Sequence, residues 1–238
     1  MNVHPSKCYV LWIYRIKNLF IYHYIMFGQT LKDVDHQPYL SITISGTLDW
    51  KTHIFGVKKK ANETLRCIKR NLHSCPERVK AQAYISFLVR PTLKYGSTAW
   101  DFCRLYIKIN WLEQVQRGAT RFAAKTYSKQ AECVTQALSH LNWPTLEHRR
   151  KVNRLTLMYK TPHGQAAINI PPYVKHKTVM TTRNSDPMKF MPAQTSCDEH
   201  KYSLWPSAID YWNSLPPNTI IMTSISNFEG AVNKNISV

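Results

Sequence analysis

The sequence predicts an α+β chain that is predominantly α-helical, with a small antiparallel β-sheet at its N-terminus. In the first fifty residues, short runs are rich in β-branched and aromatic side chains, which is typical of strands. After them, apolar residues recur every three or four positions, which is typical of amphipathic helices. Only 7 Gly stand against 13 Pro, and this balance favours helices joined by stiff linkers over an all-β fold. The 238 residues suffice for one large domain or two small ones.

Three strands are expected at the N-terminus. The segments CYVLWIYRI (Cys8–Ile16) and FIYHYIMF (Phe20–Phe27) are followed by a turn at Gly28. The third, Leu40–Ile44, alternates apolar and polar residues and ends at a Ser45-Gly46 turn. Three strands rarely form a stable sheet alone, and these carry apolar side chains on both faces. We therefore expect this sheet to need a partner.

Helical periodicity begins after Trp50. The expected inner face of the first helix comprises Ile54, Val57, Ala61, Leu65, Ile68 and Leu72. Pro76 opens a second helix, where a missing N–H has no cost, and Pro91 breaks or kinks it. The residues expected on the inner face of this second helix are Val79, Ala83, Phe87 and Leu88.

Three further helices are expected before residue 161. One spans Ile107–Tyr127, and its inner face comprises Leu112, Val115, Ala119 and Phe122. A shorter helix contains Val134, Leu138 and Leu141. The last lies in NWPTLEHRRKVNRLTLMYK, where Glu147 can pair with Lys151 one turn on, and its apolar side comprises Val152, Leu155 and Tyr159.

The periodicity ends after residue 160. Residues 161–203 mix Pro with polar residues and predict an extended, partly ordered connector. A short helix is expected near Ser207–Ser214, with Phe228 anchoring the last segment. The expected regions are thus 1–50 (sheet), 51–128 (helices), 129–160 (basic helical region) and 161–238 (Pro-rich connector and C-terminal segment).

The charge balance points to a polyanionic partner. Lys and Arg total 32 against 14 acidic residues, a formal net charge of +18. Self-repulsion at this charge destabilises a compact chain, and nucleic acid is the commonest polyanion that such an excess serves. The competing partner is an anionic membrane surface. Because Arg15 and Lys17 interrupt the apolar N-terminus, neither a signal peptide nor a membrane span is expected.

The cysteines indicate a reduced, intracellular protein, nuclear or cytoplasmic. Six cysteines are scattered without a CxxC pair, which matches neither a disulfide framework nor a zinc module. Cys197 and His200 lie three apart, but no second ligand pair follows at zinc spacing. Asp33 and Asp35 can share one face of a strand, although a polar hairpin turn explains them better. No catalytic or metal site is predicted.

Two helices carry cationic faces that suit phosphate contact. Side chains of this kind bind phosphates without reading sequence. The first face comprises Lys58, Lys59, Lys60, Arg66, Lys69 and Arg70, and the second, weaker candidate comprises Arg149, Arg150, Lys151 and Arg154. Since they flank apolar helix faces, four tryptophans are expected to be core anchors rather than base-stacking platforms: Trp100, Trp111, Trp143 and Trp212.

Seven segments occur in an order characteristic of one polymerase family: HPSKCYVLWI, GQTLKDVDHQPYLSITISGTLDWKTHI, KKANETLRCIKRNL, CPERVKAQAYISFLVRPTLKYGSTAWD, LEQVQRGATRFAAK, LNWPTLEHRRKVNRLTLMYK and WNSLPP. With them the chain resembles, nearly end to end, the C-terminal part of the reverse transcriptase of jockey-like non-LTR retrotransposons. The first two segments are similar to a palm strand and to the hairpin with the primer grip. The next two are similar to thumb-side helices, and the rest to the region downstream.

The resemblance implies a palm remnant, a thumb-like body, and contact with an RNA–DNA hybrid or RNA. It implies a primer grip at Tyr39, Leu40 and Ser41. The palm aspartates would lie upstream of Met1, so the chain is not expected to catalyse alone, and Mg²⁺ is expected only in the complete polymerase. Ser41 replaces a preferred Gly, and Lys94-Tyr95 replaces a common Glu-Tyr pair. The alternatives are a stand-alone basic module that binds RNA or protein, and a non-functional retroelement remnant.

Overall fold

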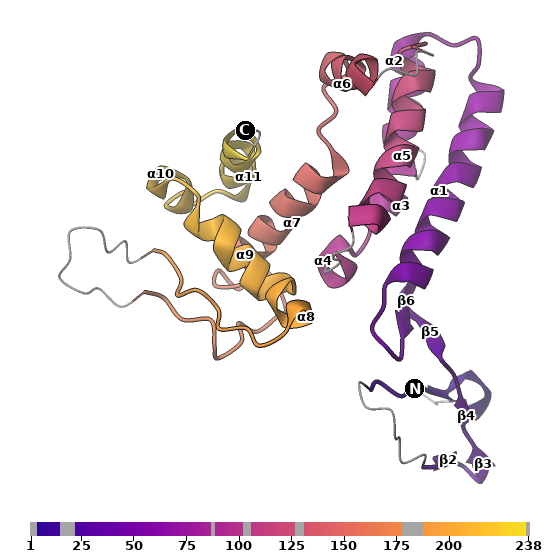
Figure 1. Cartoon of the computed structure of the whole chain (residues 1–238), viewed down its shortest axis with the longest axis vertical. Helices are drawn as coiled ribbons and strands as arrows, with labels where there is room; N and C mark the ends of the chain where they lie inside the picture. Colours follow the sequence, from indigo (N-terminus) through magenta and orange to yellow (C-terminus); the bar gives the residue numbers. More distant parts are fainter. Residues whose placement is uncertain are drawn as a thin grey trace. The chain divides into compact units, whose positions relative to one another are not determined.

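The computed structural model describes residues 4–14, 22–86, 89–101, 106–126, 131–177 and 188–236. The chain is mostly helical with small two-stranded sheets, as the sequence predicts (Figure 1). It divides into two compact units, Met1–Lys60 and Ala61–Val238, and the boundary falls within helix α1. In the part of the chain that is described, no helix is both long and apolar enough to cross a membrane.

The strands of the first unit are shorter than expected and do not form one antiparallel sheet. A 3₁₀ turn, Pro5–Lys7, precedes them. The hairpins β2–β3 and β5–β6 are antiparallel, whereas β1 and β4 pair in parallel. Each strand has only two to four residues, because left-handed turn residues such as Phe27 and Gly28 interrupt the pairing. Their bounds are β1 Tyr9–Val10, β2 Ile25–Met26, β3 Gln29–Thr30, β4 Lys32–Asp33, β5 His36–Tyr39 and β6 Ile42–Ser45. Residues 15–16 of the first expected strand and residues 20–21 of the second lie outside the described residues.

A close backbone approach joins the N-terminal segment to the end of β6. The Tyr14 amide donates to the Gly46 carbonyl at 3.1 Å. A Cβ at Gly46 would lie 2.5 Å from the Trp12 carbonyl oxygen, so only glycine fits here. Trp12 Nε1 also donates to Asp33 Oδ1 at 3.0 Å, which gives this aspartate a structural role.

Helix α1 (Lys51–Asn71) buries most of its predicted apolar face. Ile54, Ala61, Leu65 and Ile68 are buried, whereas Val57 and Leu72 are half-buried. In α2 (Glu77–Ser86), Ala83 is buried as predicted, but Val79 is 44% exposed, so its predicted burial was wrong. Phe87 and Leu88 lie outside the described residues. Pro91 lies in the first turn of α3 (Val89–Lys94), where a missing N–H is tolerated.

Helix α5 (Tyr106–Ala123) is the centre of the first helical core. Its predicted inner residues, Leu112, Val115, Ala119 and Phe122, are all buried. It packs against α2, α6 (Ala131–His140) and α7 (Leu146–Lys160). A buried polar chain joins these elements, because Tyr84 Oη donates to Gln116 Oε1 at 3.1 Å and Gln116 Nε2 donates to the Pro144 carbonyl at 3.0 Å. Trp143 stacks on Tyr84 with ring centroids 4.4 Å apart.

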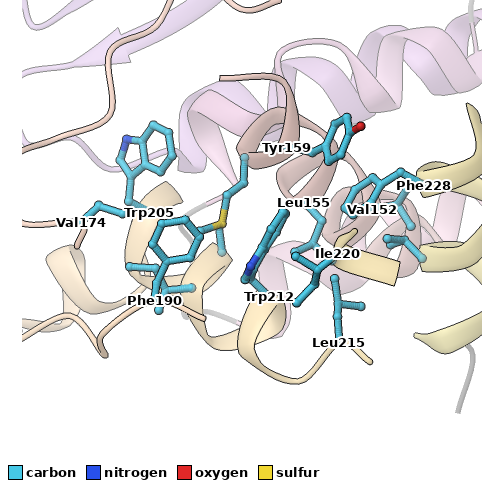
Figure 2. Packing of buried hydrophobic residues seen from close by; sticks show 14 residues of the cluster. Val152, Leu155, Tyr159, Val174, Phe190, Trp205, Trp212, Leu215, Ile220 and Phe228 are labelled. Carbon is cyan, nitrogen blue, oxygen red and sulfur yellow. The ribbon is translucent and has the colours of Figure 1, made fainter. Parts of the chain in front are cut away.

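The predicted connector and C-terminal segment form a second hydrophobic core with α7. This core is built on α7, α9 (Leu204–Asn213) and α11 (Ile225–Asn235). Three short helices also belong to the second unit: α4 (Ser97–Trp100), α8 (Asp198–Lys201) and α10 (Pro217–Ile220). Figure 2 shows the Trp212 indole inside the cluster, with Phe190 to one side and Ile220 to the other. Phe190 comes from the predicted connector, and its backbone exchanges two hydrogen bonds with the Asn213 side chain.

Three of the four tryptophans are core residues, as predicted. Trp100, Trp143 and Trp212 are buried, whereas Trp111 is half-buried. Phe228 is fully buried and stacks on Tyr159, which confirms its role as an anchor. The helix that carries it, α11, was not predicted from the sequence.

Candidate nucleic-acid interface

The C-terminal half of α1 carries an exposed cationic surface. Arg66 and Arg70 lie one turn apart and are exposed, and Lys69 is half-buried beside them. We call these three residues the α1 basic face. Among the described residues, no carboxylate lies within ion-pair distance of any of them. Their charges are therefore available to an anion from solution.

A neighbouring helix adds a further positive charge to this face. The pKa of Lys69 is lowered by burial and then by the charge of Arg121 on α5. An open depression in the surface is lined by Arg66, Lys69, Arg70 and Glu63. A phosphate placed there would offset the repulsion between Lys69 and Arg121, whereas Glu63 opposes such binding.

The predicted lysines at the start of this stretch lie in the part of α1 that belongs to the first unit. Lys59 and Lys60 are exposed, and Lys58 is half-buried. Their side chains do not contribute to the buried face of the helix, which is formed by His53 and Ile54 in this part. All six predicted α1 cations are thus at least partly accessible to solvent.

The second predicted surface is not what the structure shows, because two of its four residues are in the interior. Arg150 and Arg154 are 3% and 7% exposed. Arg150 Nε lies 3.0 Å from Asp101 Oδ1, and Arg154 Nη2 lies 2.7 Å from Asp101 Oδ2. Arg154 also donates to the main-chain carbonyl of Asp101. These two guanidinium groups pair with Asp101 in the interior and therefore cannot reach a nucleic-acid phosphate at the protein surface.

The other two residues of that surface also have contacts within the protein. Lys151 Nζ lies 2.9 Å from Glu147 Oε1, which confirms the predicted pair, and 5.4 Å from the centre of the Tyr211 ring. Arg149 is half-buried, and its Nε donates to the Pro144 carbonyl at 3.4 Å. Of the four predicted cations, only Arg149 and Lys151 remain partly exposed.

The residues expected at a primer grip lie together at the tip of the β5–β6 hairpin. Tyr39 and Leu40 are 65% and 69% exposed. Leu40 and Ser41 form the turn, and both have positive φ angles, 47° and 65°. Below the tip, the Thr43 amide donates to His53 Nδ1 at 3.2 Å, so α1 supports the hairpin from within the first unit. The tip is thus an exposed feature of the first unit.

Sequence reasoning missed the cations that other helices place near these surfaces. Arg121 approaches Lys69 from α5, and Arg90 and Lys94 on α3 approach Arg149 on α7. The signal in the sequence that could have indicated these cations was the four-residue spacing of Arg90 and Lys94, which places both on one face of a helix. Within the described ranges, no group of three or more His, Cys, Asp or Glu side chains is placed to hold a metal ion.

Comparison with protein-family models, with characterised proteins and with solved structures gave no match to this chain. Function must therefore be inferred from the chemistry of the cationic surfaces.

Proposed function

We propose that this chain contacts the sugar-phosphate backbone of nucleic acid, an RNA–DNA hybrid or RNA, through the α1 basic face. The observation that carries the proposal is the group of three cations, Arg66, Lys69 and Arg70, without a carboxylate partner among the described residues. Lys and Arg neutralise phosphates and release the condensed counterions, so such a surface binds without reading base sequence.

In this proposal the chain is the C-terminal part of a non-LTR retrotransposon reverse transcriptase, with α1 as a thumb helix and the β5–β6 tip as a primer grip. The sequence resemblance supports this assignment, and so does the exposure of Tyr39 and Leu40 at the tip. The catalytic aspartates and Mg²⁺ would belong to the complete polymerase, so this chain supplies grip and no chemistry. The protein would act in the nucleus or cytoplasm, where its cysteines stay reduced.

A salt titration tests the proposal. We would measure the affinity of the chain for a labelled RNA–DNA hybrid between about 50 and about 200 mM salt. Each phosphate contact contributes about 0.9 to the slope of log affinity against log salt, so the variant R66A/K69A/R70A should lower that slope by about 2.7. The matched control, K175A/K177A/K234A, removes the same charge from exposed positions elsewhere. Equal slopes for the two variants would contradict a contact at α1.

The core of the second unit favours a second candidate function, a stand-alone module that binds RNA or protein. The unit Ala61–Val238 encloses its own apolar cluster, from Val152 to Val232. A single cooperative urea transition of the isolated chain would support this candidate. A chain that unfolds without cooperativity, or that cannot be kept in solution, would instead favour a non-functional remnant.

A further inference from the structure

A second group of cations lies where α3 packs against α7. Arg90 and Lys94 are one turn apart on α3, and Arg149 lies in the first turn of α7. Lys160, at the other end of α7, also acts on Lys94 electrostatically. Arg90, Arg149 and Lys160 are half-buried, and Lys94 is exposed. We call these four residues the α3–α7 cation cluster.

The acidic groups around the cluster do not neutralise it. Glu113 Oε1 accepts a hydrogen bond from the Glu147 amide at 3.0 Å, and its charge acts on Arg149 less strongly than that of Arg90 does. Glu229 acts on Lys94, but less strongly than Arg149 and Arg90 do. Among the described residues, no member of the cluster has a carboxylate within ion-pair distance. Four cations thus face two carboxylates.

The adjacent phenol cannot supply the missing negative charge. Tyr84 is 2% exposed, and its Oη donates to Gln116 Oε1 at 3.1 Å. Burial raises the pKa of Tyr84, so its side chain stays neutral beside Arg90 and Arg149. Within the protein, the positive charge of the cluster is therefore only partly offset, by Glu113 acting on Arg149 and by Glu229 acting on Lys94.

The pKa values of two of these cations are lowered in the free protein. Burial and then the charge of Arg90 lower the pKa of Arg149 to about 10. Burial, followed by the charges of Arg149 and Arg90, lowers the pKa of Lys94. Burial is the larger cause of both shifts, and an anion among these side chains would relieve the part that comes from repulsion between the cations. Arginine suits such an anion, since its planar fork matches a phosphate with two hydrogen bonds.

We propose that the α3–α7 cation cluster is a second binding site for backbone phosphates of nucleic acid, separate from the α1 basic face. The identity of the ligand rests on the proposed function. The location of the site is inferred separately, from the four cations and their lack of ion-pair partners among the described residues. With two sites, the chain holds the nucleic acid at two places on the unit Ala61–Val238. The salt dependence of binding should then exceed what the α1 basic face alone can supply.

The test uses the full chain and a labelled RNA–DNA hybrid across a salt series. The variant R90Q/K94Q removes two charges and leaves Arg149, which donates to the Pro144 carbonyl, in place. Its slope of log affinity against log salt should fall by about 1.8, and R66Q/R70Q should lower it by the same amount. Combining all four substitutions should lower it by about 3.6. The charge-matched control K175Q/K177Q should leave the slope close to that of the wild type.

The outcomes separate the two proposals. If R90Q/K94Q behaves like the control while R66Q/R70Q binds more weakly, the second site is wrong and the proposed function stands. The reverse result would support the cluster and overturn the α1 assignment. A folded wild-type chain that does not bind the hybrid even at low salt would overturn both. If R90Q/K94Q fails to fold, Lys94→Gln alone, at an exposed position, should still lower the slope by about 0.9, and an unchanged slope would overturn the cluster.

Discussion

Arg154 Nη2 lies 2.7 Å from Asp101 Oδ2, inside the protein and 53 residues away along the chain. The other carboxylate oxygen of Asp101 lies 3.0 Å from Arg150 Nε. One aspartate therefore holds two buried guanidinium groups of α7, and it joins this helix to the chain immediately after α4. Breaking such a buried group by removing one partner is far more costly than losing a surface pair.

Replacing Asp101 with Asn should destabilise the fold strongly. The substitution keeps the size of the side chain but leaves two buried positive charges without a counter-charge. We expect the free energy of unfolding in urea to fall by about 3–5 kcal/mol. The control is Asp210→Asn on the exposed side of α9, which should change it by less than about 0.5 kcal/mol. Similar losses in both variants would show that the Asp101 pairs contribute little.

The burial of Arg150 and Arg154 could not be predicted from the sequence because it depends on a distant partner. Four-residue spacing of arginines beside an apolar stripe is typical of a solvated helix face. In α7, however, five helices pack against the same helix: α3, α4, α5, α9 and α11. Because so many helices pack against α7, Arg150 and Arg154 are buried as well. The carboxylate of Asp101, distant in the sequence, makes their burial possible by pairing with both. The apolar positions Val152, Leu155 and Tyr159 were predicted correctly.

Dependence on tertiary contacts also explains why the C-terminal part of the second hydrophobic core was not predicted. Helix α11 was not predicted because it buries only Phe228 and Val232 in eleven residues, which is too sparse a pattern to distinguish a helix from a connector. Phe190 and Val174 belong to segments without periodicity, and their burial follows from tertiary contacts alone. For the exposure of Arg66 and Arg70, by contrast, the local pattern sufficed, because most of the predicted apolar positions of α1 are buried and leave the cationic side in solvent.

Replacing Ser41 with Gly should stabilise the β5–β6 hairpin. Leu40 and Ser41 both have positive φ, and a residue with a Cβ is strained there, whereas glycine is not. The unfolding free energy should rise by about 1 kcal/mol, and the thermal midpoint should rise with it. Thr43→Gly, in the middle of β6, is the matched control and should have the opposite effect. A lower midpoint for S41G would show that the serine side chain stabilises the turn.

Replacing Glu63 with Gln should tighten binding to the RNA–DNA hybrid. Glu63 is exposed on α1 and lines the same depression as Arg66, Lys69 and Arg70, so its charge repels an incoming phosphate. Exposed charge pairs contribute about 0.2–1 kcal/mol, so affinity should rise by up to about fivefold at low salt. The control Glu132→Gln, exposed on α6, removes the same charge away from the depression. If E132Q tightens binding as much as E63Q does, the gain reflects net charge and not the α1 basic face.

The affinity for the hybrid should also depend on pH through Lys69. Its pKa is lowered in the free protein, by burial and by Arg121, so part of the population loses the proton at a pH where an ordinary lysine keeps it. A bound phosphate favours the charged form and raises this pKa again, so binding takes up a proton. Affinity should therefore fall as the pH rises from about 7 to about 9.5, and it should fall less in Lys69→Arg, because arginine keeps its charge throughout this range. Lys175→Arg, at an exposed position outside the proposed sites, should follow the wild type. A wild-type curve parallel to that of K69R would mean that Lys69 does not contact a phosphate, and Arg66 and Arg70 would then be the only members of the α1 basic face left to do so.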